Sequence, residues 1–355
     1  MPVFNHDLYA RIASNLRCFV EFRAGVVRGN APHPKRQVQN LKRRSQATNK
    51  QLTAANQKLK AQRRSLSQRN RQIQRLQGEL ARVTAQSNMR ESKVSRVGFG
   101  TLPDFLVIGA EKAGTTFLYS LLQEHPHFRA AAKKEVHYLD SRKFEFGPQW
   151  YRAQFPLHEK VGERNTVTGE ASPYYLLHPL AAKRAYELLP DVKLIVLLRN
   201  PIERAYSGYQ HKVRDGVEPL SFEAAIEAEP ERLAGERDKI ARSGDYYSNN
   251  YRWYSYLTRG IYVDQIKQWH EYFAPEQFMI IQSEDFFEEP VATLDRVCTF
   301  VGLQPGQVDT PDSASPGTAP QYAPIKSETR NALRAYFEPH NRSLYEYLGV
   351  DFGWV

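Results

Sequence analysis

The spacing of apolar residues along the chain changes near residue 100. Before this point, apolar residues recur at steps of three and four, which predicts helices. After it, short and nearly continuous apolar runs at 105–108, 192–198 and 278–281 alternate with segments of helical period. Such runs, separated by helices, are typical of buried parallel strands covered on both faces. The pattern therefore predicts an α/β fold, a doubly wound parallel sheet flanked by helices, after an N-terminal helical extension.

Helices are expected between and after these strands. Helical spacing occurs at 117–123, 201–213, 291–301 and 326–348. Pro201 suits a first helical turn, where its missing N–H group costs nothing. The Pro-, Gly- and Ser-rich stretch 303–325 predicts a long loop before the last helix.

The extension begins with a basic helical segment. Residues 8–28 place apolar side chains at helical spacing among four arginines, and glycine and prolines break the pattern at 29–34. We assign residues 1–35 to this basic amphipathic helix and its break. The helix could lie on an anionic membrane surface; docking on the protein's own core or on a second copy is the favoured alternative.

A heptad pattern follows in residues 36–87. Position a is mostly aliphatic and position d is mixed: Val38, Ser45, Leu52, Leu59, Leu66, Ile73 and Leu80 against Leu41, Thr48, Ala55, Gln62, Arg69, Leu76 and Val83. This pattern indicates a weak coiled coil that could form a homo-oligomer. Parallel copies would repel, however, because no acidic residue occurs between Phe22 and Glu79. A basic tail is favoured over a segment that binds an acidic partner. Residues 88–101 are expected to form a hinge into the main domain, 102–355.

Charge separates the two parts of the chain. The net charge is +10, but residues 1–95 hold 20 Lys or Arg and 4 Asp or Glu, whereas residues 96–355 hold 29 and 35. Binding to a polyanion or an anionic membrane therefore concerns residues 1–95. Only Cys18 and Cys298 are present, so no disulfide framework is implied. Without an apolar run of membrane-spanning length or a signal-peptide core, a cytoplasmic location is expected, peripheral to a membrane if the extension binds one.

The most informative motif is the turn after the first apolar run. Gly109 and Gly114 have the spacing of a nucleotide-triphosphate loop, but Thr115 stands where that loop has its lysine. The lysine lies inside the loop, at Lys112. Strand, glycine turn and helix N-terminus together predict an anion-binding site made of backbone N–H groups. Inside the loop, Lys112 could stabilise the negative charge that grows on phosphate oxygens during group transfer.

Three further segments carry polar groups that could act in the same site. Glu135 and His137 are two residues apart, and we expect an extended backbone that puts them on one face as a base and its partner. Residues 168–175, Thr-Gly-Glu-Ala-Ser-Pro-Tyr-Tyr, are expected to form a hydrogen-bonding turn after a strand. Arg199 follows the apolar run 192–198, at the ligand-binding edge of a doubly wound sheet.

An arginine at that strand end favours a bound phosphate over a bound metal. A nucleotide kinase would often carry an acidic residue there to hold Mg²⁺, and a lysine directly after Gly114; this chain has neither. Arg199 can instead grip a phosphate group through two hydrogen bonds. His125, His178 and His270 lack metal-ligand spacing, and we expect no metal.

In this order and spacing, the four segments resemble the sulfotransferase family, most of all its heparan-sulfate-type branch and bacterial relatives. The resemblance covers residues 102–355 and implies a P-loop-like fold. It also implies transfer of a sulfuryl group from 3′-phosphoadenosine 5′-phosphosulfate (PAPS) to a hydroxyl or amine of a carbohydrate, glycolipid or small metabolite.

The resemblance also implies a role for each residue that matches the family motifs. Lys112, Glu135 and His137 would be catalytic: Lys112 would stabilise the leaving phosphate, Glu135 would be the base, and His137 would orient it. The donor would be bound by Lys112, Ala113, Gly114, Thr115, Thr116, Arg199 and Ser207, with the last two on its 3′-phosphate. Asp140, Ser172 and Tyr174 are candidates for contact with the acceptor.

Two departures from the family bear on the acceptor. The family often has a lysine where this chain has Ala171, and often places basic residues in the loop 303–325, which here has none. Both favour a neutral or weakly acidic acceptor. Two other functions stay open: a kinase-like phosphotransferase, and a non-catalytic protein that binds polyanions or membranes.

Overall fold

The computed structural model describes residues 46, 50, 100–157, 166–308 and 322–354. The chain divides into two units, Met1–Ser87 and Asn88–Val355. In the first unit only residues 46 and 50 are described, and both are helical. The predicted amphipathic helix 1–35, nearly all of the heptad segment 36–87, and the hinge 88–99 lie outside the described residues.

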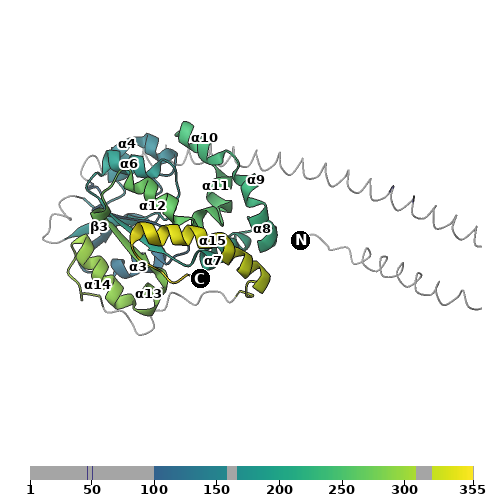
Figure 1. Ribbon diagram of the computed structural model, residues 1–355. Helices are drawn as coiled ribbons and strands as arrows, with labels where there is room; N and C mark the ends of the chain where they lie inside the picture. Colours follow the sequence, from purple (N-terminus) through teal and green to yellow (C-terminus); the bar gives the residue numbers. More distant parts are fainter. Residues whose placement is uncertain (1–45, 47–49, 51–99, 158–165, 309–321, 355) are drawn as a thin grey trace, which may run out of the picture. The chain divides into compact units, whose positions relative to one another are not determined.

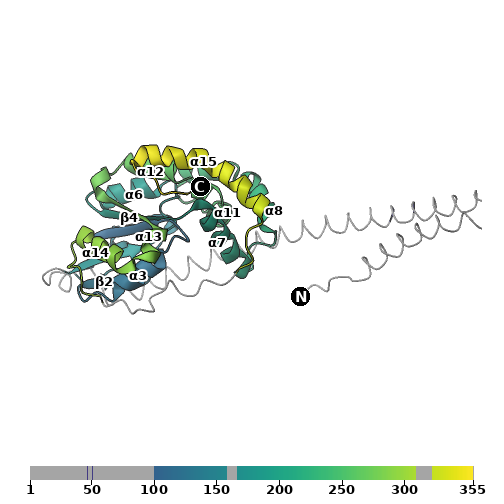
Figure 2. The ribbon, with the colours of Figure 1, turned by 60° about the horizontal axis from the view of Figure 1, so that its bottom comes forward.

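The second unit is built on five parallel strands in the order β2-β3-β1-β4-β5 (Figures 1 and 2). The strands are β1 Phe105–Gly109, β2 Phe128–Ala130, β3 Val167–Ala171, β4 Lys193–Leu198 and β5 Phe278–Gln282. Three were predicted from their apolar runs. The three-residue β2 was missed because it is too short to show a pattern. The prediction of a turn at 168–171 was wrong, because Thr168–Ala171 lies inside β3, where its polar residues are buried.

Helices cover both faces of the sheet. Figure 2 shows α3, α13 and α14 on one side of the strands and α6, α12 and α15 on the other. The α-helices are α3 Thr115–Gln123, α4 Gly147–Arg152, α6 Ala181–Leu188, α7 Pro201–Arg214, α8 Phe222–Glu227, α9 Glu229–Leu233, α10 Glu236–Arg242, α11 Asn249–Tyr254, α12 Tyr262–His270, α13 Ser283–Glu288, α14 Pro290–Val301 and α15 Ser327–Leu348. The predicted doubly wound α/β architecture is confirmed.

Local signals explain where two of these helices begin. Asn200 caps α7: its side-chain oxygen accepts the N–H of Ile202 at 3.0 Å, and Pro201 occupies the first turn. Helix α3 begins at Thr115, two residues before the predicted start. Gly114 makes this possible, because it takes a left-handed conformation (φ 96°) that suits glycine.

The core lies between the sheet and its helices. All five residues of β1 are buried, as expected for the strand at the centre of the sheet. Trp269 of α12 is also buried, and its indole N–H donates to the carbonyl of Leu176 at 3.3 Å. Among the described residues, no helix combines the length and apolarity that crossing a membrane requires.

Replacing Gly169 by alanine tests the packing around β3. A Cβ atom there would lie 2.5 Å from the ring of Phe105, whereas in Gly208→Ala on α7 it would meet nothing closer than 3.6 Å. We expect Gly169→Ala to lose about 1–3 kcal/mol of unfolding free energy through overpacking. Gly208→Ala should gain about 0.5–1 kcal/mol because alanine restricts the unfolded chain and favours the helix. Urea unfolding measures both; equal stability of the two variants would contradict this packing.

Candidate active site

The turn between β1 and α3 presents backbone donors at a helix N-terminus. No side chain caps α3, so its first N–H groups, from Thr115 onward, remain available to an anion. The loop carbonyls are held from outside: Arg199 donates to the carbonyl of Lys112 at 3.1 Å, and Ser283 donates to that of Ala113 at 2.8 Å. Ala113 and Thr115 are buried, whereas Thr116 is exposed. The turn is therefore a fixed cradle.

Positive charge gathers around this cradle. Burial lowers the pKa of Lys112, and the charges of Arg214, Lys212 and Arg199 lower it further. Lys212 lies 3.9 Å from Glu111, which also pairs with Arg259. Mutual repulsion of these cations is relieved when an anion binds among them.

Arg199 connects this cradle to the neighbouring strand. Arg199 follows β4 directly, as predicted, and its carbonyl oxygen accepts a hydrogen bond from the Tyr262 hydroxyl at 2.7 Å. Ser207 is half-buried on α7, two turns further along. Both belong to the segment that leaves the sheet beside β1.

The loop 134–140 brings three predicted residues into contact. His137 Nε2 lies 3.0 Å from Glu135 Oε2, and His137 Nδ1 lies 2.7 Å from Asp140 Oδ2. The expected extended backbone was wrong: Glu135 and His137 have φ of 61° and 54°, in the left-handed region. The two side chains meet because the loop turns sharply, and not because they alternate along a strand.

The charges in this loop support one another. Hydrogen bonding to His137 is the main reason that the pKa of Glu135 falls to about 2. Burial acts to lower the pKa of His137, but Asp140 and Glu135 outweigh it and raise that pKa. Burial acts to raise the pKa of Asp140, but the neighbouring His137 and Arg252 keep it low. At neutral pH both carboxylates are ionised.

Arg252 of α11 competes for the same imidazole nitrogen. Its Nη2 lies 2.9 Å from His137 Nε2, close to the 3.0 Å contact of that nitrogen with Glu135. A guanidinium group only donates hydrogen bonds and a carboxylate only accepts them. Protonated Nε2 therefore donates to Glu135, and unprotonated Nε2 accepts from Arg252. The protonation of Nε2 therefore determines whether His137 bonds to Glu135 or to Arg252.

Ser172 and Tyr174 contact residues of this site. Both are buried. Ser172 accepts the N–H of His137 at 3.3 Å and donates to Glu170 at 2.7 Å. The guanidinium carbon of Arg252 lies 4.8 Å from the centre of the Tyr174 ring, which is a cation–π contact.

Sequence reasoning missed Arg252, Glu170, Lys212 and Arg214. Arg252 contacts a residue 115 positions away, and no local pattern announces such a pair. Lys212 and Arg214 look like ordinary basic residues in the last turn of a helix. Glu170 was quoted in a motif, but one of its three hydroxyl partners, Tyr151, lies outside that motif, nineteen residues away.

The histidines without metal-ligand spacing have other contacts. His125 Nε2 lies 2.9 Å from the carbonyl of Gln304, and burial lowers the pKa of His178 to about 4. His270 contacts the hydroxyl of Tyr347 at 2.8 Å. Across the described ranges, no group of three or more His, Cys, Asp or Glu is arranged to hold a metal ion.

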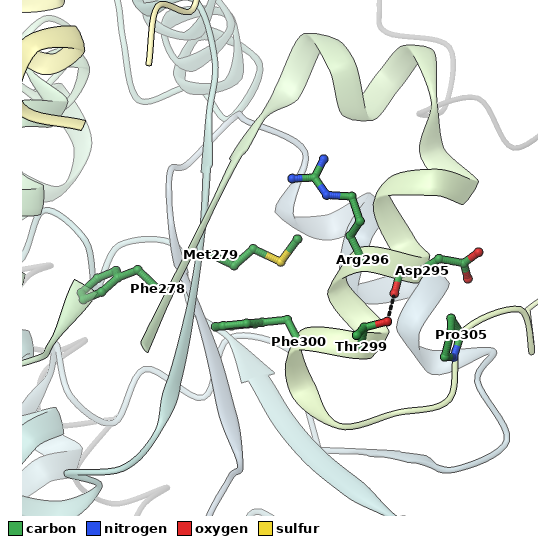
Figure 3. Close-up of a pocket in the computed structure, with 7 residues that line it drawn as sticks. All are labelled: Phe278, Met279, Asp295, Arg296, Thr299, Phe300 and Pro305. Atoms are coloured by element: carbon green, nitrogen blue, oxygen red, sulfur yellow. Dashed lines mark hydrogen bonds between the residues drawn. The ribbon is translucent and has the colours of Figure 1, made fainter. Parts of the chain in front are cut away.

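A separate cavity of about 570 Å³ lies beside β5 and α14 (Figure 3). It is lined by Phe278, Met279, Asp295, Arg296, Thr299, Phe300 and Pro305. None of these residues belongs to the loops after β1, β3 or β4, so the cavity is distinct from the polar site described above.

Comparison with known proteins connects this site to a family. A model described as the sulfotransferase domain matches residues 102–314. The chain is 28% identical over 318 residues to the membrane-associated sulfotransferase kil1 of Dictyostelium discoideum, covering 71% of this chain and 66% of that protein. It is 30% identical over 276 residues to the bifunctional heparan sulfate N-deacetylase/N-sulfotransferase 3 of Homo sapiens, covering 70% of this chain and 30% of that protein.

A solved structure agrees in both fold and sequence. The crystal structure of a sulfotransferase from Alicyclobacillus acidocaldarius superposes with a TM-score of 0.53 at 30% identity, covering 71% of this chain and 98% of that one. The chain thus spans almost all of this bacterial protein, but less than two-thirds of the two curated relatives.

Replacing Asp140 by asparagine tests the charge chain through His137. Asp140 is the main group that raises the pKa of His137 against burial. We expect Asp140→Asn to lower the pKa of His137 below its ordinary value near 6.5. NMR titration of the imidazole measures this pKa. Asp104→Asn is the control, because the Asp104 carboxylate also accepts a hydrogen bond, from the Thr168 N–H, but at the opposite end of β3. An unchanged titration of His137 in Asp140→Asn would contradict the assignment.

Proposed function

Since the chain belongs to the sulfotransferase family, we propose that it transfers a sulfuryl group from PAPS to a hydroxyl or amine of an acceptor. The acceptor is a carbohydrate, a glycolipid or a small metabolite. The family match confirms the resemblance drawn from the four motifs, and the protein is a transferase of the sulfotransferase class. One observation carries the proposal most: Arg199, at the end of β4, bonds to the Lys112 carbonyl of the cradle after β1. That contact brings together the two elements to which we assign the phosphates of the donor.

We assign the two ends of the donor to these two elements. The backbone N–H groups of Gly114, Thr115 and Thr116 and the ammonium of Lys112 would hold the 5′-phosphate. Ala113 belongs to the same turn. Arg199 and Ser207 would bind the 3′-phosphate. The surrounding cations Lys212 and Arg214 add to the attraction for a highly charged nucleotide.

The reaction would be an in-line displacement at sulfur. A bond forms between the acceptor oxygen and sulfur, and the bond between sulfur and the 5′-phosphate oxygen breaks. The electron pair of the broken bond stays on the phosphate, where Lys112 stabilises it. The acceptor proton passes to Glu135, which is ionised at neutral pH because its pKa lies at about 2.

His137 and Arg252 would adjust the strength of that base. While Nε2 donates to Glu135, the carboxylate is a weak base. Once Nε2 is unprotonated and accepts from Arg252, Glu135 keeps only its contact with Lys134 at 2.8 Å and becomes a stronger base for the acceptor proton. Asp140 holds the ring in place through Nδ1 in both states.

The choice of acceptor rests on relatives and on charge. The human relative is named for a reaction on heparan sulfate, which supports a carbohydrate-containing acceptor. The balance of 29 basic and 35 acidic residues in 96–355 and the presence of Ala171 favour one that is neutral or weakly acidic. Binding of a membrane or polyanion by residues 1–95, and self-association through the heptads, remain proposals.

Lys112→Ala and Glu135→Gln test the two catalytic roles. We expect Lys112→Ala to lower kcat about 10²- to 10³-fold, because a stabilising charge on the leaving group is lost. Glu135→Gln should lower kcat about 10²- to 10⁴-fold and leave donor affinity unchanged. Release of 3′-phosphoadenosine 5′-phosphate (PAP) measures turnover. The control is Lys183→Ala, which removes an exposed lysine of α6. Normal turnover in Glu135→Gln would remove that residue from the role of base.

Arg199→Gln tests the assignment of the 3′-phosphate. Losing a charge-assisted contact worth about 1.5–3 kcal/mol should weaken PAP binding roughly 10- to 100-fold. Binding of adenosine 5′-phosphate, which lacks the 3′-phosphate, should hardly change. Calorimetric titration measures both ligands, with Arg330→Gln on α15 as a surface control. Equal weakening of both ligands would show that Arg199 acts only by shaping the cradle.

A further inference from the structure

We propose that Glu170 is a positioning residue that fixes the geometry of the loop 134–140 through the hydroxyl groups of Ser172 and Tyr175. The inference rests on the proposed function of that loop. Glu170 lies on β3 and is fully buried. Its carboxylate accepts hydrogen bonds from Tyr151 at 2.5 Å, Ser172 at 2.7 Å and Tyr175 at 2.9 Å.

The two hydroxyl groups connect the carboxylate to the loop. A hydroxyl has one hydrogen to donate and lone pairs with which to accept. Because Ser172 and Tyr175 give their hydrogens to Glu170, their lone pairs face the loop. Ser172 accepts the N–H of His137 at 3.3 Å, and Tyr175 accepts those of Tyr138 at 2.9 Å and Leu139 at 3.4 Å. The N–H groups of residues 137–139 are thus connected to the Glu170 carboxylate through the hydroxyl groups of Ser172 and Tyr175.

The loop needs such support because its backbone is unfavourable. Glu135 and His137 both have positive φ, a conformation that side-chain-bearing residues rarely adopt. Residues in such conformations persist only when their surroundings over-determine them. Besides the hydroxyl contacts, the Glu135 N–H donates to the carbonyl of Ala171 at 3.2 Å, at the end of the same strand. The last residue of β3 and the turn that follows it therefore accept the backbone N–H groups of both Glu135 and His137.

The carboxylate form is the one that fits these contacts. Burial raises the pKa of Glu170, and its three hydroxyl donors oppose that rise. Both Ser172 and Tyr175 already receive N–H groups, so each has its own hydrogen free to give. Replacing Glu170 by glutamine would place an amide N–H₂ group among these donors, and at least one hydroxyl would have to turn away.

Tyr119 provides a matched control. Its hydroxyl is also buried against β3: it donates to the carbonyl of Gly169 at 3.0 Å and accepts the N–H of Ala131 at 3.2 Å. It contacts the strand one residue before Glu170 and makes no hydrogen bond to residues 134–140 within the described part of the chain. Tyr119→Phe therefore removes a buried hydroxyl of the same kind without touching the loop.

The test compares Tyr175→Phe, Ser172→Ala and Tyr119→Phe in the full chain. We expect Tyr175→Phe to lower kcat at least about tenfold, with Ser172→Ala falling in the same direction, because the base is misplaced. The KM for PAPS and the affinity for PAP should stay within about twofold of wild type, because the donor cradle belongs to other strands. Tyr119→Phe should keep kcat within about twofold even where it costs similar stability.

A double-mutant cycle shows whether both hydroxyls act through Glu170. In a Glu170→Gln background, adding Tyr175→Phe should cost far less kcat than it does in wild type, because the link is already broken. Full additivity would overturn the proposal. If Glu170→Gln does not fold, Glu170→Asp, whose shorter side chain withdraws the carboxylate from the hydroxyls, replaces it in the cycle with the same expected non-additivity.

A readout without substrate separates this proposal from the proposed function. NMR titration of His137 should shift in Tyr175→Phe and stay as in wild type in Tyr119→Phe. If the wild-type protein transfers no sulfuryl group, the proposed function fails, while the titration still tests the positioning role. An unchanged His137 titration in Tyr175→Phe, together with unchanged kcat in an active protein, would overturn the role of Glu170.

Discussion

The adjacency of β3, β1 and β4 in a parallel sheet is the constraint on which the site depends. Parallel strands end at the same edge, so the loops that follow them meet there. Val107 of β1 pairs with Ala171 of β3, and Gly109 pairs with Val196 of β4. The three strands therefore end at the same edge, with β4 reaching three residues beyond the end of β3. Segments far apart in the sequence thereby bring Lys112, Ser172 and Arg199 to one edge, where Arg199 also donates to the Lys112 carbonyl at 3.1 Å.

Electrostatics then gives this edge its chemistry. Lys112 lies among other cations, and their charges lower its pKa together with burial. Around the loop 134–140, negative and positive side chains contact one another in turn: Glu135, His137, Asp140 and Arg252. In the proposed reaction, the first group would attract an anionic donor and stabilise the leaving phosphate. The second would supply the base, with the protonation of His137 setting the strength of that base. Glu170 would support the loop that carries this second group.

Much of the fold could be predicted from the sequence, because apolar runs and helical spacing directly reflect burial. The strands at 105, 193 and 278 and the helix after Pro201 follow from these patterns. The polar strand Val167–Ala171 could not be recognised, because the partners that satisfy Glu170 include Tyr151, nineteen residues away. Similarly, the contact of Glu135 with His137 was expected for the wrong reason: left-handed residues, and no strand, bring them together. Arg252 depends on tertiary folding and leaves no local signal.

The central claim is that the turn after β1 and the end of β4 together form one site for a nucleotide with both 5′- and 3′-phosphates. A crystal structure of the protein with PAP tests it most directly. The account predicts that the 5′-phosphate lies on Lys112 and the N–H groups of 114–116, with the 3′-phosphate on Arg199 and Ser207. A nucleotide bound elsewhere, for example in the cavity beside β5, or bound with its 3′-phosphate pointing away from Arg199, would contradict it.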